Sequence, residues 1–196
     1  MNQMKKETRI LNVELRTPEN EEQKMIVEGY AITFNSPATH GYTEIIDKGA
    51  LDTTDMSDVP LKYNHEDSHL IMARTRNKSL ELKKDEKGLF IKAELIDTQS
   101  NKDIYKSIKA GLIDKMSFAF TVDKDEYDYD TDTRKILSID RLYDVSVVDI
   151  PFYDSTSVYA RNENDDFMTR RAELRKEHED KQALEKAKQE LLSKLG

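Results

Sequence analysis

A two-residue alternation of apolar and polar side chains recurs along the first 150 residues of this chain and limits the folds open to it. Successive side chains point to opposite faces of a β-strand, so each alternating stretch predicts a strand with one buried face. Short, continuous apolar runs indicate strands that are buried on both faces. We expect strands over residues 8–15, 25–34, 78–83, 89–95, 115–122, 135–142 and 144–150.

Local signals add one hairpin and one helix to these strands. The segment 85–88 separates two predicted strands, and Gly88 is expected to supply the positive φ of a tight turn. Ser100 and Asp103 form an S-x-x-D helix start, and Gly111 marks the end of that helix. The apolar stripe of the helix is formed by Ile104, Ile108 and Leu112. The sequence therefore predicts an α+β protein in which strands dominate.

A change in composition near residue 160 divides the chain in two. Of the 15 aromatic residues, only Phe167 lies beyond that point, and all four prolines precede it. Residues 161–196 contain 9 basic and 9 acidic side chains. Apolar residues recur in this segment at three- and four-residue spacing, with strong helix formers between them, at Leu184, Ala187, Leu191 and Leu195. We expect a core domain over residues 1–160 and a charged helical tail over 161–196. The tail is either a solvated, mobile extension or a docking and self-association element.

Charge and cysteine content restrict the partners and the setting. The chain has 31 Lys+Arg against 39 Asp+Glu, a formal net charge of −8, so we expect no nucleic-acid partner. It has no cysteine, which excludes disulfides, thiolate metal sites and a cysteine nucleophile. The first residues reach no apolar stretch, and no run approaches the length of a membrane span. We therefore expect no membrane partner and a cytoplasmic setting.

Three residues supply the parts of a serine hydrolase. Ser117 alternates with large apolar neighbours, so Met116, Phe118 and Phe120 share one face of their strand while Ser117 and Ala119 share the other. A serine hydroxyl needs a base to take its proton, and the base needs a group that holds its tautomer. His65, at the end of a short strand-like run after Pro60, is the candidate base.

Asp144 is the candidate carboxylate that orients the base. It lies on a strand face with Ser146 and Val148, and a carboxylate between apolar strand residues requires a partner such as histidine. Asp149, of opposite parity, remains an alternative third member. Ser146 itself is expected to be a structural serine.

Two metal motifs compete with this interpretation. His65-Glu66-Asp67-Ser68-His69 matches H-E-x-x-H, which binds zinc through both histidines when it is helical. Pro60 and the strand-like residues after it argue against that helix, and no third ligand is evident. The acidic stretch 123–134 begins like a calcium loop but has Thr133 where the turn glycine belongs, so we interpret it as a solvated connection between strands. We expect no metal and no cofactor.

At these residues the chain resembles a known family. The succession EGYAITFN, LKYNHED, MARTRNKSLEL, KGLFIKAEL, DIYKSIKAGLIDKMSFAFTV and YDVSVVDIPFYDSTSVYAR is similar to the prohead proteases of tailed bacteriophages, which are related to herpesvirus assemblin. The resemblance covers about residues 8–161. It implies a serine endopeptidase on a mostly antiparallel β-barrel flanked by a few helices.

The resemblance also implies roles, partners and a location. By position it makes His65, Ser117 and Asp144 catalytic, although the third member is often glutamate in the family. The implied substrates are the scaffolding segment of the phage major capsid protein and the protease itself, cleaved inside the assembling procapsid in the host cytoplasm. The tail would then dock into the scaffold or be removed by self-cleavage, and a homo-oligomer remains open. Two other functions stay open, a non-enzymatic capsid assembly protein on the same barrel and a zinc metallopeptidase using His65, Glu66 and His69.

Overall fold

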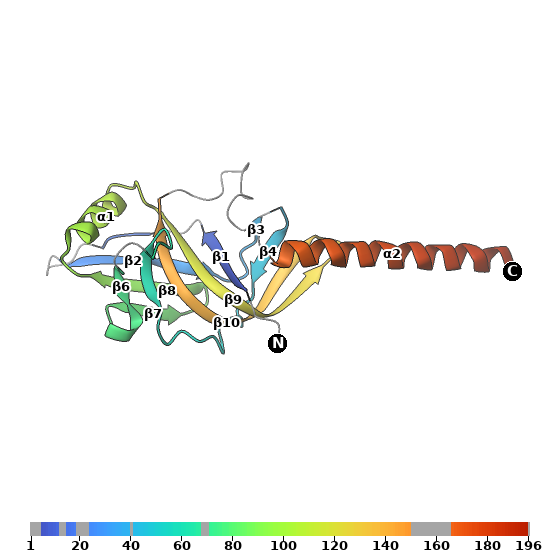
Figure 1. Ribbon diagram of the computed structural model, residues 1–196, viewed down its shortest axis with the longest axis horizontal. Coiled ribbons are helices and arrows are strands. Elements are labelled where there is room, and N and C mark those ends of the chain that lie inside the picture. Colours follow the sequence, from blue (N-terminus) through green and yellow to red (C-terminus); the bar gives the residue numbers. More distant parts are fainter. Residues whose placement is uncertain are drawn as a thin grey trace.

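The computed structural model describes residues 5–11, 15–18, 24–39, 41–67, 71–149 and 166–195. Its strands are β1 (Lys6–Leu11), β2 (Met25–Thr33), β3 (Ala38–Thr39), β4 (Thr43–Ile46), β5 (Pro60–Tyr63), β6 (Ala73–Arg74), β7 (Leu80–Lys84), β8 (Gly88–Leu95), β9 (Lys115–Asp128) and β10 (Thr133–Val148). Its helices are α1 (Gln99–Lys109), α2 (Asp166–Leu195) and the short 3₁₀ helix η1 (Thr75–Asn77). Strands dominate the part of the chain before α2, which confirms the predicted α+β class (Figure 1).

The strands form two sheets. In the larger, seven-stranded sheet the order is β1-β9-β10-β4-β3, and β5 pairs with β10 and with β6. In the smaller sheet, β8 lies between β2 and β7. Most pairings are antiparallel, but β4 and β5 both run parallel to β10. Apolar side chains from both sheets share one core, as Val27 and Ile91 of the small sheet and Phe118, Ile136 and Val145 of the large sheet show.

The predicted closed barrel is wrong for the strands that the structure describes, because they form two separate hydrogen-bonded sheets. The physical reason lies in what a two-residue period encodes. The period assigns side chains to the two faces of a strand, whereas closure depends on whether the outermost strands hydrogen-bond to each other. Packing one sheet against another buries the same apolar faces without that last pairing.

Two local predictions are corrected in detail. The hairpin between β7 and β8 is confirmed, but Gly88 is not among the glycines with positive φ. A Cβ at Gly88 would lie 1.9 Å from the carbonyl oxygen of Ile32, so glycine is needed there for the close approach of β2. The predicted start of helix α1 at Ser100 is wrong, because the cap is Thr98, whose side chain accepts a hydrogen bond from the Asn101 amide at 3.2 Å. Ile104 and Ile108 are buried as predicted, but Leu112 lies beyond the helix and is exposed, and Gly111 follows the helix end with φ +72°.

The acidic stretch 123–134 is more ordered than predicted. Strand β9 continues to Asp128 and β10 begins at Thr133, so the connection between them is a tight turn. Ion pairs stabilise the polar end of this hairpin, since Arg134 contacts Asp125 at 2.7 Å and is itself almost fully buried. The alternating charged residues of this stretch therefore belong to the outer ends of two long strands, which hydrogen-bond to each other.

Helix α2 is a single 30-residue helix, and most of its length extends away from the sheets (Figure 1). Its first turns contact the hairpin of β9 and β10, where Phe167 is buried between Tyr42 and Tyr127. The predicted boundary between residues 160 and 161 lies outside the described residues. No helix in the described part of the chain is long and apolar enough to span a membrane.

Candidate active site

Three different elements bring His65, Ser117 and Asp144 together. Ser117 is near the start of β9, and Asp144 is near the end of β10, which pairs antiparallel with β9. Strand β5 runs parallel to β10 and pairs Tyr63 with Val147, so the turn after β5 places His65 beside Asp144. Residues separated by 52 and 79 positions in the chain thereby become neighbours.

The three side chains form a continuous hydrogen-bonded chain. His65 Nε2 lies 2.5 Å from Ser117 Oγ, and His65 Nδ1 makes a short hydrogen bond to Asp144 Oδ1. A carboxylate only accepts, so the network assigns the proton of the neutral imidazole to Nδ1 and leaves Nε2 to accept from the serine. Ser117 and Asp144 are buried, whereas the His65 side chain remains 20% exposed. This is the arrangement that nucleophilic acyl transfer by a serine requires.

His65 lies in a turn, and its expected place in a strand is wrong. Strand β5 ends at Tyr63, and Asn64 and His65 follow with left-handed φ values of 51° and 57°. Two consecutive non-glycine residues in this region are unfavourable and persist only when the surroundings hold them. The left-handed turn redirects the chain so that the imidazole points back toward β9 and β10.

Hydrogen bonds from the end of β10 hold this turn. The Asn64 amide N–H donates to the carbonyl of Val147 at 3.0 Å, and Asn64 Nδ2 donates to Asp149 Oδ1 at 2.9 Å. The Tyr63 hydroxyl also donates to Asp149. Burial of the phenol, followed by this hydrogen bond, raises the pKa of Tyr63 to about 12, so the hydroxyl keeps its proton at neutral pH. Asp149 therefore supports the turn that presents His65, while Asp144 contacts the imidazole.

The environment of Asp144 keeps it ionised. Burial of the carboxyl raises its pKa, but the hydrogen bond from His65, the electrostatic interaction with that residue and the ammonium group of Lys6 outweigh burial, and the pKa of Asp144 is lowered overall. Lys6 Nζ, on β1, lies 3.2 Å from Asp144 Oδ2. The two carboxylate oxygens thus have different partners, with Oδ1 facing the histidine and Oδ2 facing the lysine.

Strand β1 also reaches Ser117. Ile10 is opposite Ser117 in the sheet, and the carbonyl oxygen of Arg9 lies 2.8 Å from Ser117 Oγ. The serine has one proton, so it donates to His65 or to this carbonyl, and only the first choice activates it. Buried hydrogen bonds of 2.6 and 2.9 Å from the Arg9 guanidinium to Glu44 hold β1 at this register. Sequence reasoning missed Lys6 and Arg9, because nothing in the sequence pairs β1 with β9.

Ser146 was expected to be structural, yet it contacts both His65 and Asp144. Its hydroxyl oxygen lies 3.2 Å from Asp144 Oδ1, 3.2 Å from the His65 amide nitrogen and 3.2 Å from His65 Nδ1. A signal for this position was present in the sequence, since strand parity puts Ser146 on the same face as Asp144.

The zinc motif does not take the helical form that it needs. The positive φ of His65 is incompatible with a right-handed helix, and His69 lies outside the described residues. Within the described ranges, no group of three or more His, Cys, Asp or Glu side chains is placed to hold a metal ion.

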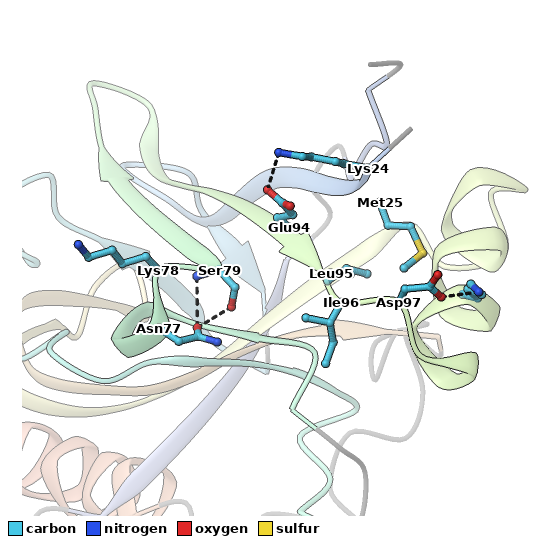
Figure 2. Close-up of a pocket in the computed structure, with 10 residues that line it drawn as sticks. Lys24, Met25, Asn77, Lys78, Ser79, Glu94, Leu95, Ile96 and Asp97 are labelled. Carbon is cyan, nitrogen blue, oxygen red and sulfur yellow. Dashed lines mark hydrogen bonds and ion pairs between the residues drawn. The ribbon is translucent and has the colours of Figure 1, made fainter. Parts of the chain in front are cut away.

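A hollow of about 610 Å³ lies elsewhere, between the first residues of β2, the end of β8 and the start of α1. Figure 2 shows its lining, where several charged and polar side chains are already paired, including Lys24 with Glu94 and Asn77 with Ser79. His65, Ser117 and Asp144 are not among the residues that line it. The hollow therefore adds nothing to the chemistry of His65, Ser117 and Asp144.

Comparison with known proteins relates the chain to phage proteases. The sequence profile of the caudovirus prohead serine proteases matches residues 12–171, a range that includes all three residues. The prohead protease of Enterobacteria phage HK97 is 29% identical over 148 residues, which are 74% of this chain and 63% of that protein. The chain thus matches less than two thirds of that relative's length. The solved structure of the bacteriophage T4 capsid assembly protease covers 72% of this chain and 98% of its own, with 12% identity and a TM-score of 0.43.

Proposed function

This chain belongs to the caudovirus prohead serine protease family, and we propose that it is the serine endopeptidase that matures a phage capsid. The observation that carries the proposal is the 2.5 Å separation of His65 Nε2 from Ser117 Oγ, combined with the hydrogen bond between His65 Nδ1 and Asp144. Because Asp144 accepts the hydrogen bond from His65 Nδ1, the other imidazole nitrogen, Nε2, faces the serine and is free to accept its proton.

The proposed reaction has two half-reactions. Ser117 Oγ attacks the carbonyl carbon of the scissile peptide while His65 Nε2 takes the hydroxyl proton, and Asp144 stabilises the resulting imidazolium. When the C–N bond breaks, His65 returns that proton to the leaving amine and an acyl-enzyme remains. A water molecule then attacks the ester carbonyl while His65 takes its proton, and when the bond between the acyl carbon and Ser117 Oγ breaks, His65 returns that proton to Oγ and the peptide acid leaves.

The proposed substrates are the scaffolding segment of the phage major capsid protein and the protease itself. The reaction would take place inside the assembling procapsid in the host cytoplasm. The charged tail, which begins before α2, would dock into the scaffold or be removed by self-cleavage. These proposals rest on the family and on the name of one relative, the prohead protease of phage HK97.

Two other functions are less well supported. A non-enzymatic assembly protein would have no need for a buried serine and a buried aspartate in hydrogen-bond contact with one histidine, since buried polar groups are costly to keep. A zinc peptidase would need a helix through His65, which has a positive φ.

The test is co-expression of the chain with the major capsid protein of its own phage, followed by mass spectrometry of both proteins. Wild type and His69→Ala should cleave the capsid protein, and added chelator should have no effect. Ser117→Ala should reduce cleavage by about 10⁶-fold, because it removes the nucleophile. Ser138→Ala, on the same β10 strand as Asp144 but outside the site, serves as the matched control.

Three outcomes would contradict the proposed serine protease, and a fourth would contradict self-cleavage. Cleavage that persists in Ser117→Ala would exclude the serine mechanism. Loss of cleavage with both His69→Ala and chelator would favour zinc. Wild type that assembles with the capsid protein without cutting it would favour the assembly role, and mass spectra that show only intact protease would exclude self-cleavage.

A further inference from the structure

Ser146 lies at the centre of the proposed catalytic group without belonging to it. It is fully buried on β10, and in the pairing of β10 with β9 it is the residue directly opposite Ser117. Residues two apart on a strand share a face, so Asp144 and Ser146 both project toward the histidine. A single side chain thus adjoins the nucleophile strand, the base and the carboxylate.

The hydrogen-bonding capacity of a serine hydroxyl matches this position. The His65 backbone N–H donates to Ser146 Oγ at 3.2 Å, and the single proton of the hydroxyl is donated to Asp144 Oδ1 at 3.2 Å. Oδ1 is also the oxygen that accepts from the His65 ring. Ser146 therefore connects the main chain of the base to the same carboxylate oxygen that its imidazole uses.

This connection acts on the strained part of the site. The left-handed conformations of Asn64 and His65 need external support, and the Val147 carbonyl and Asp149 bind the Asn64 end of the turn. Ser146 binds the main-chain N–H of His65 itself. Loss of this bond would let the His65 backbone relax and move the imidazole away from Ser117, and small displacements of a catalytic base are costly to rate.

We propose that Ser146 is a positioning residue of the serine protease site, holding the His65 backbone in its left-handed turn and holding Asp144 Oδ1 toward the imidazole. This inference rests on the proposed function. It assigns Ser146 no contact with substrate, and its effect on the reaction passes through His65 and Asp144.

The test measures the rate at which a fluorophosphonate probe labels Ser117, from pH 5 to pH 9, in wild type, Ser146→Ala and Ser138→Ala. We expect Ser146→Ala to label about tenfold more slowly at its optimum, the effect of losing one well-placed hydrogen bond. Ser146→Cys keeps nearly the same volume and a weak donor, so it should recover part of the rate. Ser138→Ala should match wild type, and thermal unfolding should verify that every variant is folded.

The pH profile separates positioning from mere packing. Asp144 is faced by His65, by Lys6 of β1 and by the hydroxyl of Ser146, and Asp67 lies close enough to sense the charges of both Lys6 and Asp144. Removing the hydroxyl leaves more negative charge on the oxygen that faces the imidazole, which favours the imidazolium. The acidic limb of the labelling profile should therefore move to higher pH in Ser146→Ala and stay in place in Ser138→Ala.

Each outcome bears on a different statement. Wild type that takes up no probe at Ser117 would overturn the proposed function itself. Normal labelling of wild type together with a Ser146→Ala profile that superimposes on that of Ser138→Ala would leave the protease intact and overturn the role of Ser146.

Discussion

Asp144 and Asp149 carry the same carboxylate near the end of β10, but the structure gives them different partners. Asp144 is buried and contacts His65 Nδ1, whereas Asp149 is exposed and binds Tyr63 and Asn64. The two residues have opposite strand parity, which decides the side of the sheet that each one reaches. At the scale of single residues, the face of the sheet from which each carboxylate projects therefore decides whether it contacts His65.

Substitution of each aspartate by asparagine should distinguish them. Asp144→Asn should lower kcat/KM for a capsid-derived peptide by about 10⁴-fold, because a neutral amide permits the imidazole tautomer that cannot accept the serine proton. Asp149→Asn should lose about tenfold or less, since its amide oxygen can still accept from Tyr63. Equal losses, or a larger loss in Asp149→Asn, would show that Asp149 is the third member.

At the scale of elements, β1 and α2 meet on one network of charges around the buried Arg134 and its partner Asp125. Arg134 of β10 donates to Glu7 of β1 at 2.7 and 2.9 Å and contacts Asp125 of β9 at 2.7 Å. Arg170 of α2 binds the same Asp125 at 2.6 Å. Removal of one partner of a buried ion pair is strongly destabilising, so the buried Arg134 and its partner Asp125 depend on each other. The strand that contributes Lys6 to the site and the first turns of the tail helix are therefore built on shared side chains.

Phe167 is the apolar part of this junction, and its removal should loosen α2. Its ring is 2% exposed, lies 4.8 Å from the Tyr42 ring and has the Arg134 guanidinium 4.2 Å from its centre. Phe167→Ala should cost about 3 kcal/mol of docking free energy through lost burial and the cavity left behind. Amide hydrogen exchange over the first turns of α2 should then become faster.

Leu184→Ala on the same helix is the matched control, since Leu184 is 57% exposed and should change exchange little. Equal exchange in the two variants would show that Phe167 does not anchor the helix.

At the scale of the whole molecule, acidic side chains are the main pH-dependent contribution to stability. Nine described aspartates have a pKa below the ordinary value of 3.8, namely Asp47, Asp55, Asp58, Asp67, Asp85, Asp125, Asp128, Asp132 and Asp144. Hydrogen bonds and nearby cations favour their charged forms in the folded state. A depressed folded pKa contributes stability above the unfolded pKa, and this contribution is lost as the pH falls through the folded pKa.

The free energy of unfolding in urea should therefore hold near neutral pH and fall as the pH drops from about 4 to about 2. Asp132 is a sharp probe of this loss, because the hydrogen bond from Arg171 lowers the pKa of Asp132 to about 2 although partial burial opposes the shift. Asp132→Asn should show a smaller loss over that range than wild type. Asp130→Asn, in the same turn, is the control, and parallel curves for the two variants would contradict this account.

The sequence by itself determined the strand-rich α+β class, the β7–β8 hairpin, helix α1 and the identity of the three candidate residues. Each of these depends on local chemistry. Strand period assigns Ser117 and Asp144 to faces, turn and cap residues end elements, and the order of the quoted motifs carries the resemblance to the phage proteases.

Only the tertiary structure decided which strands are neighbours and how His65 is oriented. The pairing of β1 with β9 places Lys6 and Arg9 at the site, and the pairing of β10 with β9 and β5 makes Ser146 a neighbour of both Ser117 and His65. The left-handed turn at His65 is unfavourable for the local sequence and persists because β10 supplies its hydrogen bonds. Local patterns encode faces and ends of elements, whereas contacts between distant strands arise only when the whole chain packs.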